Sequence, residues 1–428
     1  MSAGFERDRD DVALGARAIV VLPDQGDATR DAEARLAETA GLAAAIGLVV
    51  TDKIVFKVRG AKPATLIGSG QMEQLAATAR MAEATLVVFD ASLTPVQQRN
   101  LETGLGAKVI DRTGLILEIF GERAATAEGR LQVELAHLDY QAGRLVRSWT
   151  HLERQRGGFG FLGGPGETQI EADRRLIRDR MARLRRELDS VSRTRGLHRE
   201  RRQRAPWPVI ALVGYTNAGK STLFNRLTGA DVMAEDLLFA TLDTTLRQIA
   251  LPGIDKAILS DTVGFVSDLP TQLVAAFKAT LEEVVSADLL VHVRDIAHPD
   301  TEAQRADVEA VLNEIGVAES TPRFEVWNKL DLLDGDRHDA MVAEAERRDD
   351  VVAISALTGE GVDRLMTEVA GKLTEAHRRY WITLDAGDGA GAAWLHAHGE
   401  VLGQVPDGVQ TQYEVRLAER DYERFLQR

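Results

Sequence analysis

The sequence predicts an α/β protein organised around one phosphate-binding domain, and two observations support this prediction. The first is the stretch Gly214-Tyr-Thr-Asn-Ala-Gly-Lys-Ser221, which follows an apolar run at 209–213 and precedes a helix-like segment at 222–227. Glycines that turn a buried strand into a helix N-terminus direct backbone N–H groups toward phosphate oxygens. The second is the alternation of apolar runs with helix-like segments, which is typical of a sheet covered by helices.

Composition restricts the class of protein. The 428 residues suffice for two to four domains, and 44% of them are hydrophobic, enough for more than one core. Cysteine is absent, which excludes disulfides, thiolate metal sites and cysteine nucleophiles. No signal-like start or long apolar span is present, so we expect a cytoplasmic monomer without a membrane span. The net charge of −14 argues against general nucleic-acid binding.

Residues 1–128 are predicted to form an N-terminal α/β domain. Residues 2–11 are charged and aperiodic, so we expect no regular structure there. Gly68 and Gly70 resemble part of a phosphate loop, but no Gly-Lys-Ser ending follows them, so we interpret them as a helix entry. Strands are predicted at 18–22, 47–50, 54–58 and 85–89, and helices at 31–45 and 71–82.

Residues 129–204 are predicted to form an antiparallel pair of helices. Apolar residues recur at steps of three and four in 131–152 and again in 170–191, with the glycine-rich segment 157–166 between them. Arginine outnumbers acidic residues here. One interpretation is a solvated helix face; the other, which we favour, is an arm that binds RNA phosphates and stacks bases on aromatic rings. The residues of this RNA-binding hypothesis are Arg154, Arg156, Phe159, Phe161, Arg174, Arg175 and Arg178.

Residues 205–373 are predicted to form the nucleotide domain. Lys220 is expected to reach the β- and γ-phosphates, and the Ser221 hydroxyl to ligate Mg²⁺. A second hydroxyl ligand is expected from Thr241, for which Thr244 and Thr245 are alternatives. In Asp261-Thr-Val-Gly264, we expect the carboxylate to hold Mg²⁺ through a water and the Gly264 amide to meet the γ-phosphate.

A second motif indicates the base. Asn328-Lys-Leu-Asp331 follows an apolar strand, and a carboxylate at Asp331 can accept from the guanine N1–H and the exocyclic amine, which adenine cannot match. The backbone of Ser355-Ala-Leu357 is expected to contact the guanine oxygen. The combination predicts a P-loop GTPase domain that binds GTP and GDP. The predicted nucleotide-binding residues are Gly214, Tyr215, Thr216, Asn217, Ala218, Gly219, Lys220, Ser221, Thr222, Phe239, Ala240, Thr241, Leu242, Asp243, Asp261, Thr262, Val263, Gly264, Asn328, Lys329, Leu330, Asp331, Ser355, Ala356 and Leu357.

Two positions bear on hydrolysis. Phe265 follows Gly264, where a GTPase with its own water-positioning glutamine would place that residue. Intrinsic turnover is therefore expected to be slow, and the missing group to come from a partner or from elsewhere in the chain. The Asn217 carboxamide either holds a monovalent cation such as K⁺ against the phosphates or braces the loop by a hydrogen bond. The residues expected to take part in catalysis are Lys220, Asn217, Thr241 and Gly264.

Residues 374–428 are predicted to form a small C-terminal α+β domain. A flexible turn is expected at 386–391, a helix at 392–400 and a strand at 411–418. His396 and His398 lack partners at ligand spacing, so we interpret them as surface residues and Trp394 as a core residue.

These motifs together resemble the HflX-type ribosome-associated GTPases of the Obg-HflX-like superfamily. The resemblance implies an N-terminal domain and helical hairpin that engage the large ribosomal subunit, with hydrolysis stimulated by ribosomal particles. It also implies that Thr241 is the Mg²⁺ threonine. Thr244 departs from the family by replacing a proline, and the loop at 160–164 is longer and less basic than usual. The most specific segments are 89–102, 109–120, 149–158, 164–171, 214–222 and 239–243.

The expected function is that of a Mg²⁺-dependent GTP-hydrolysing translation or stress factor that splits or rescues stalled ribosomes. One alternative within the superfamily is a ribosome-assembly checkpoint GTPase. An alternative of another class is a GTP-dependent signalling switch that binds a protein partner without RNA.

Overall fold

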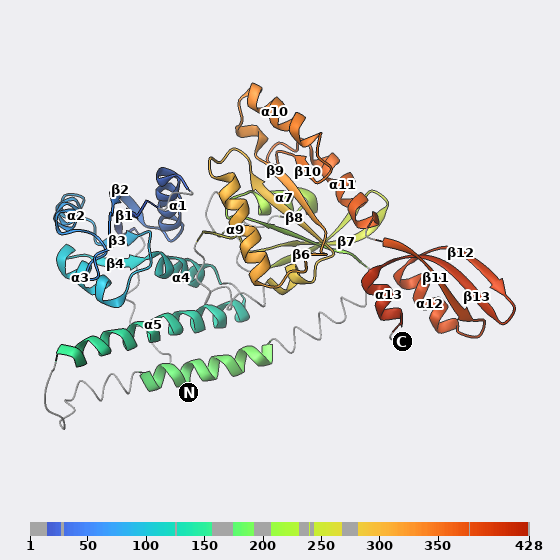
Figure 1. Ribbon diagram of the computed structural model, residues 1–428, viewed down its shortest axis with the longest axis horizontal. Coiled ribbons are helices and arrows are strands. Elements are labelled where there is room, and N and C mark those ends of the chain that lie inside the picture. The colour runs from blue at the N-terminus through green and yellow to red at the C-terminus, as the bar shows by residue number, and fades with distance from the viewer. Residues whose placement is uncertain are drawn as a thin grey trace.

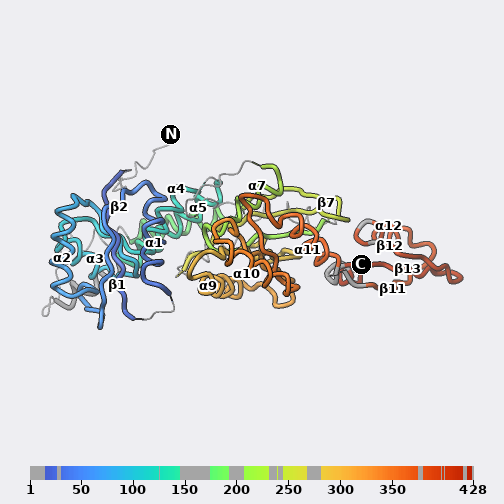
Figure 2. The backbone as a smooth tube through the Cα atoms, turned by 90° about the horizontal axis from the view of Figure 1, so that it is seen from above, coloured from blue at the N-terminus to red at the C-terminus, as the bar shows by residue number. Residues whose placement is uncertain are grey.

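The computed structural model describes residues 15–26, 30–124, 126–155, 174–191, 207–230, 239, 244–267, 281–375 and 377–426. Three β-sheets organise this part of the chain into an N-terminal domain, a central domain and a C-terminal domain, as shown in Figure 1. The three domains follow one another along the long axis, with the C-terminal sheet at the far end from β1 and β2 (Figure 2). None of the described helices is long and apolar enough to cross a membrane.

The N-terminal domain is a parallel four-stranded sheet in the order β2-β1-β3-β4 with helices on both faces. Leu36 and Leu115 lie in the core on one face, and Leu75 and Leu101 in the core on the other. The α/β prediction is confirmed. The strands are β1 (Arg17–Asp24), β2 (Val49–Lys57), β3 (Leu86–Phe89) and β4 (Lys108–Asp111), and the helices α1 (Ala32–Ala45), α2 (Ser69–Met81), α3 (Pro95–Leu105) and α4 (Arg112–Arg123).

Local details of this domain differ from the sequence-based expectation. The two short strands predicted at 47–50 and 54–58 are one strand, β2, because the residues between them continue the pairing with β1. Gly68 is the N-cap of α2, as the helix-entry interpretation requires. The elements α3, β4 and α4 were not individually predicted, since their apolar runs are short and lie close together.

Helix α5 (Ala127–Gln155) and a second helix over 174–191 lie side by side beneath the N-terminal domain (Figure 1). Arg180 donates two hydrogen bonds to the Glu134 carboxylate across the pair, at 2.8 and 2.9 Å. Met181 and Leu184 are buried, as the predicted seam requires. Arg175 and Arg178 are exposed, whereas Arg174 is half-buried. The expected loop with Arg156, Phe159 and Phe161 lies outside the described residues, as does the Arg154 side chain.

The central domain is a six-stranded sheet in the order β10-β9-β8-β5-β7-β6, parallel except for the β6–β7 pair. The carboxyl ends of β5, β7, β8 and β9 therefore meet along one edge, where the predicted motifs follow their strands. Its elements are β5 (Val209–Gly214), α7 (Lys220–Thr228), β6 (Thr245–Leu251), β7 (Ile254–Asp261), β8 (Leu289–Asp295), α9 (Thr301–Glu314), β9 (Arg323–Asn328), η1 (Leu330–Leu332), α10 (Gly335–Ala345), β10 (Val351–Ala353) and α11 (Val362–Glu375).

The C-terminal domain is an antiparallel three-stranded sheet covered by α12 and α13 on one face. Helix α12 begins at Gly389, inside the segment predicted as a turn, because Asp388 caps it by accepting from the Gly391 N–H at 2.8 Å. His398 stacks on Trp394, which packs against the core, and the described residues hold no cluster of metal-ligating side chains. The elements are β11 (His377–Asp385), α12 (Gly389–His398), β12 (Glu400–Asp407), β13 (Gln410–Ala418) and α13 (Glu419–Leu426).

Candidate nucleotide-binding site

The phosphate loop connects β5 to α7, and its two outer glycines are required by close approaches. A Cβ on Gly214 would lie 2.2 Å from the Val293 carbonyl oxygen of the neighbouring strand. A Cβ on Gly219 would lie 2.2 Å from the Asn328 side-chain nitrogen, at a left-handed φ of +91°. The first clash is with backbone and the second with a side chain held by two hydrogen bonds, so a larger residue would displace the loop or Asn328. The glycine spacing in the sequence therefore reflects direct contact with β8 and with the end of β9.

Lys220 opens α7 and lies inside the loop that precedes it. Its Nζ donates to the carbonyl oxygens of Gly214 and Tyr215, at 3.1 and 2.8 Å. Burial lowers the pKa of Lys220 to about 8, although the Asp261 carboxylate opposes this shift. Asn217, at the crest of the loop, has a left-handed φ of +58°. The loop thus holds a buried ammonium group beside a turn of backbone N–H groups, which is an arrangement suited to phosphate.

Two side chains whose oxygen atoms suit a cation, Ser221 of α7 and Asp261, meet at the end of β7. The Ser221 hydroxyl donates to the Asp261 carboxylate at 2.8 Å, and Asp261 is fully buried. Hydroxyl and carboxylate oxygens fit a small hard cation such as Mg²⁺, which P-loop GTPases generally use. The predicted third partner, Thr241, lies outside the described residues together with Ala240, Leu242 and Asp243.

The segment after Asp261 pairs with the phosphate loop. The Thr216 N–H donates to the Phe265 carbonyl oxygen at 2.7 Å, and the Phe265 N–H donates to the Gly214 carbonyl oxygen at 3.2 Å. A Cβ on Gly264 would lie 2.8 Å from the Thr216 Cα and 3.2 Å from the Lys220 Nζ. Gly264 therefore lies beside the buried ammonium, where its N–H can meet a terminal phosphate. Phe265 is 2% exposed, so its apolar ring belongs to the core and cannot orient a water.

Asn328 connects the base end of the site to the phosphate loop. Its side chain donates to the Ala218 carbonyl oxygen at 2.8 Å and accepts from the Ala356 N–H at 2.8 Å. Asp331 is exposed and accepts a hydrogen bond from the Ser355 hydroxyl. The structure thus brings the phosphate loop together with the Asn328 and Ser355 motifs, which lie more than 100 residues further along the chain. Lys329 has a φ of +72°, and its Nζ pairs with Asp295 at 2.8 Å.

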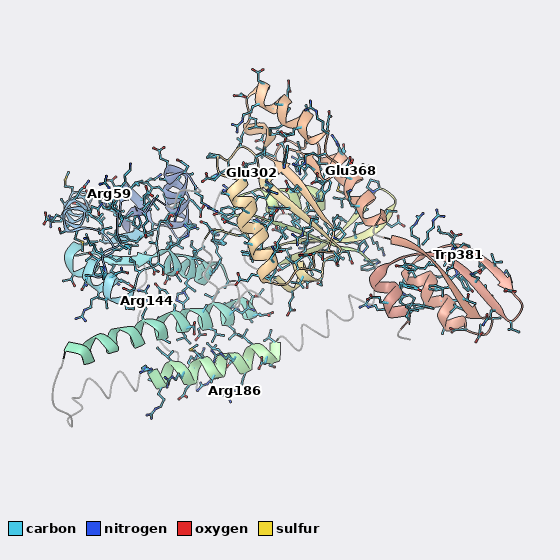
Figure 3. All side chains as sticks on the ribbon, in the orientation of Figure 1. Arg59, Arg144, Arg186, Glu302, Glu368 and Trp381 are labelled. Carbon is cyan, nitrogen blue, oxygen red and sulfur yellow. The ribbon has the colours of Figure 1, made fainter. Side chains whose placement is uncertain are left out.

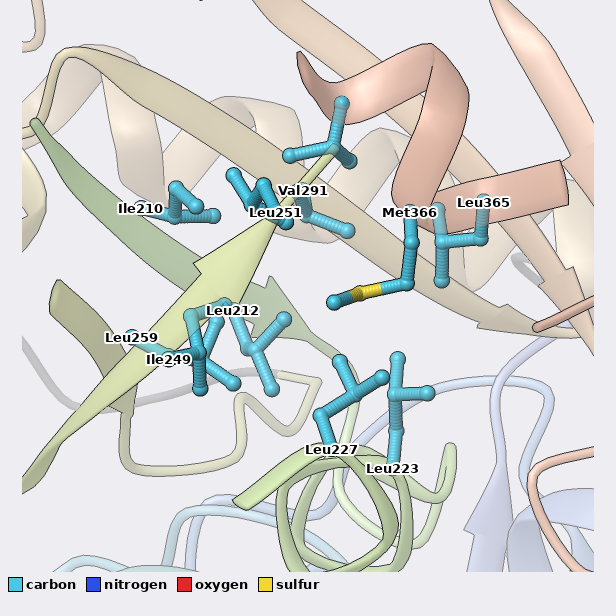
Figure 4. A pocket seen from close by; sticks show the side chains of 11 residues that line it. Ile210, Leu212, Leu223, Leu227, Ile249, Leu251, Leu259, Val291, Leu365 and Met366 are labelled. Carbon is cyan, nitrogen blue, oxygen red and sulfur yellow. The ribbon is translucent and has the colours of Figure 1, made fainter. Parts of the chain in front are cut away.

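Some residues in the predicted set face the core. The Thr262 hydroxyl donates to the Leu212 carbonyl oxygen at 2.6 Å and is fully buried. Val263 and Leu330 are also buried in the core, so a contact with nucleotide from these three residues would use their backbone. A separate apolar cavity, lined by Ile210, Leu223, Met366 and neighbouring side chains, lies between the sheet and the helices (Figure 4). It presents no polar group, so we interpret it as part of the hydrophobic core.

The N-terminal domain contributes residues that the sequence motifs do not indicate. The Tyr215 hydroxyl donates to Glu38 at 2.7 Å and accepts from the Ser267 N–H at 2.8 Å. Arg112 donates to the Ser267 hydroxyl at 2.8 Å, to Asp90 at 2.7 Å and to Glu38. These five residues, called the inter-domain cluster below, surround the segment that follows Gly264. Arg112 lies in the 109–120 segment that carries the family resemblance. The residue types of that segment do not indicate that Arg112 bonds Ser267, about 150 residues further along the chain.

Burial and the Glu38 carboxylate keep the Tyr215 hydroxyl protonated, and the neighbouring carboxylates keep Arg112 positively charged. Burial raises the pKa of Tyr215 to about 12 and the Glu38 carboxylate adds to the shift, so the hydroxyl remains a donor at neutral pH. Burial acts to lower the pKa of Arg112, but Glu38 and Asp90 hold it above its ordinary value. Phe239, the one described residue of its segment, meets Phe120 of α4 edge-on, with ring centroids 4.7 Å apart.

Four family models match consecutive parts of the chain. They are GTP-binding GTPase N-terminal at residues 33–121, GTP-binding GTPase Middle Region at 123–202, 50S ribosome-binding GTPase at 209–329 and HflX C-terminal domain at 340–428. The GTPase HflX of Magnetococcus marinus is 52% identical over 92% of this chain and 90% of its own length. That of Escherichia coli is 45% identical over 83% of this chain and 82% of its own length.

The matches extend from the N-terminal sheet through the paired helices and the phosphate loop to the C-terminal sheet. A resemblance limited to the nucleotide domain would leave the flanking domains unmatched, and this is not the case. The geometry described above supplies the phosphate loop that GTP hydrolysis needs, and the curated relatives are GTPases. The chain therefore belongs to the HflX family of GTPases.

Proposed function

We propose that this GTPase binds the large ribosomal subunit and uses its GTP cycle to split or rescue stalled ribosomes. The single observation that carries the proposal is the inter-domain cluster, which joins the nucleotide site to the domain that holds the arginine-rich helix pair. A state change at the terminal phosphate is thus linked, through the N-terminal domain, to the helix pair that would contact RNA. The description 50S ribosome-binding GTPase for residues 209–329 supports a large-subunit partner.

The nucleotide contacts follow from the geometry of the site. Lys220 would bind the β- and γ-phosphates, and Ser221 and Thr241 would ligate Mg²⁺, with Asp261 held behind a water. When bound, Mg²⁺ neutralises charge between the phosphates. Asp331 would accept from guanine N1–H and the exocyclic amine, and the Ser355–Leu357 backbone would meet the guanine oxygen. The remaining predicted residues, from Gly214 to Thr222 and from Phe239 to Asp243, would form the walls around the phosphates.

Hydrolysis would depend on groups beyond this chain. Because Phe265 is buried and apolar, the position that needs a water-orienting side chain lacks one. We therefore infer that ribosomal particles stimulate turnover. Asn217 stands at the crest of the loop, where its carboxamide would hold K⁺ against the phosphates. Equal hydrolysis rates in Na⁺ and K⁺ buffers would contradict that role.

The RNA-facing surface would be the helix pair. Arg175 and Arg178 are exposed on the helix over 174–191, and Arg174 is half-buried beside them. Figure 3 shows Arg186 further along the same helix. Planar guanidinium groups bind phosphates and stack on bases. Arg154, Arg156, Phe159 and Phe161 would extend this surface to the end of the arm.

The test is GTP turnover with purified ribosomal particles and without them, followed by sedimentation of the particles. We expect faster turnover with particles and a shift from intact ribosomes to separate subunits in GTP. Accumulation of subunit precursors on depletion of the protein would favour an assembly checkpoint.

Reversing the charges of Arg175 and Arg178 tests the RNA contact. The affinity for ribosomes should fall, and the remaining affinity should depend less steeply on salt concentration. Binding that survives this reversal would favour a protein partner without RNA.

A further inference from the structure

Arg226 reaches from α7 to the loop that follows β10. Its Nε donates to the Ala356 carbonyl oxygen at 2.6 Å, and one terminal nitrogen donates to the Leu357 carbonyl oxygen at 2.5 Å. Gly359 leaves room for the guanidinium, because a Cβ there would lie 2.7 Å from the same side chain, at a φ of +97°. Arg226 thus holds two successive peptide groups of the Ser355–Leu357 loop.

The loop is held from its other side as well. The Ala356 N–H donates to Asn328, and the Thr358 N–H donates to the Ser355 hydroxyl at 3.1 Å. In a planar trans peptide the C=O and the N–H point in opposite directions. Because the Ala356 C=O points to Arg226, the Leu357 N–H of the same peptide points away from α7. Hydrogen bonding of a carbonyl to a cation also strengthens the N–H donor of that peptide.

We propose that Arg226 is a positioning residue for guanine: it orients the backbone N–H group of Leu357 toward the guanine oxygen without touching the nucleotide, while the Ser355 and Ala356 N–H groups bond Glu360 and Asn328. This inference rests on the base contacts proposed above. It adds a physical link between the two ends of the site, since Arg226 lies on the same helix as Lys220. Movement of α7 would then affect the base and the phosphates together. Leu357, 68% exposed, lies in the positioned loop and provides an apolar side chain beside the base.

The test compares nucleotides that differ by one group. In 6-thio-GDP the guanine oxygen is replaced by sulfur, a weaker acceptor, whereas IDP lacks the exocyclic amine that Asp331 would bind. We expect Arg226→Ala to weaken GDP binding roughly 5- to 10-fold, the value of about one hydrogen bond. It should also remove most of the preference for GDP over 6-thio-GDP. The preference for GDP over IDP should not change, which a general loss of structure would not reproduce.

Two further variants keep the test specific. Arg226→Lys retains a cation and one donor, so it should recover part of the preference for GDP over 6-thio-GDP. Gly359→Ala displaces the guanidinium without removing it and should act in the same direction as Arg226→Ala. The matched control is Arg247→Ala. Arg247 is an exposed arginine of the same domain, and within the part of the chain that the structure describes it donates to the carbonyl oxygen of its neighbour Leu246 and makes no contact with the Ser355–Leu357 loop.

The outcomes separate this inference from the base contacts on which it rests. A wild-type protein that binds GDP and 6-thio-GDP equally would overturn the oxygen contact and the role of Arg226 with it. A wild-type preference that persists in Arg226→Ala would overturn the role of Arg226 alone. Loss of the preference over 6-thio-GDP with an intact preference over IDP would support the proposal.

Discussion

The two ends of the nucleotide site are built differently. At the base end every described partner belongs to the central domain. Asn328 bonds Ala218 and Ala356, Asp331 accepts from Ser355, and Arg226 supports the loop. At the phosphate end the segment after Gly264 is held from outside, by Glu38 and Arg112 of the N-terminal domain. A base end built within one domain can keep its contacts while the N-terminal domain moves. A phosphate end shared by two domains cannot change without affecting both.

Helix α4 is the physical link at the phosphate end. It begins at Arg112, which bonds Ser267, and it carries Phe120, which packs against Phe239. The preceding residue, Asp111, accepts from Tyr140 at 2.6 Å and pairs with Arg144 at 2.8 Å, both on α5. Figure 3 shows Arg144 on the side of α5 that faces the N-terminal domain. A continuous set of contacts thus runs from the phosphate loop to the helix pair, and the predictions below test whether it carries coupling.

The largest effect is expected from Arg112→Ala. The change removes the cation that Asp90 and Glu38 share, while Arg35 still pairs with Asp90 at 3.1 Å. The free energy of unfolding should therefore fall by up to about 3–5 kcal/mol, the upper end applying if Arg35 cannot compensate. Urea unfolding should show this loss in the transition of the N-terminal domain. The ratio of GTP to GDP affinity should change as well, while the preference for GDP over IDP stays constant. Arg80→Ala, an exposed arginine of the same domain, is the control. Unchanged GTP-to-GDP ratios in Arg112→Ala would show that the inter-domain cluster is structural only.

Lys220→Ala should strongly weaken triphosphate binding. It removes charge-assisted hydrogen bonds worth about 1.5–3 kcal/mol, and the affinity for GTP should fall on the order of 10- to 100-fold. Competition with a fluorescent guanine nucleotide measures the change. Lys256→Ala provides a control, because Lys256 lies over the Trp207 ring away from the loop. An unchanged GTP affinity would refute the assigned role.

The contrast between the two ends also explains what the sequence could predict. The motifs around Lys220, Asp261, Asn328 and Ser355 follow strand ends in chain order, so the rules for parallel sheets bring them to one edge. The helix pair could be predicted from the spacing of apolar residues. The inter-domain cluster could not be predicted, because an arginine after a short strand carries no local sign of a distant partner. Arg226 was hidden for the same reason, since its partners are carbonyl oxygens, and these are independent of residue type.

Asp331→Asn tests the base end alone. Asparagine lacks the charge and presents donors where the guanine N1–H and amine need an acceptor, so GDP affinity should fall roughly 10-fold and the preference over ADP should shrink. Nucleotide competition measures both. Asp336→Asn, at an exposed position on α10, is the matched control. The GTP-to-GDP ratio should not change, since the phosphate end is untouched. A retained preference for guanine would contradict the role of Asp331.

The smallest effect is the pH dependence of nucleotide binding. Burial lowers the pKa of Lys220 to about 8 in the protein without nucleotide, and bound phosphates should raise it again. Binding above about pH 8 must then take up a proton, so affinity should fall by up to about tenfold per pH unit. Calorimetry in two buffers of different ionisation enthalpy measures the proton uptake.

Two observations separate this prediction from general alkaline damage: the behaviour of a variant, and the opposite pH dependence of nucleotide affinity and protein stability. Lys220→Arg carries a charge that is not lost in this pH range. Its nucleotide affinity should be lower than that of the wild type but should not change with pH. Without nucleotide, the folded protein binds fewer protons than the unfolded chain between about pH 8 and the ordinary lysine pKa of 10.5, so the Lys220 contribution to stability should rise with pH there. Affinity and stability therefore respond to the same proton in opposite directions, whereas damage would lower both.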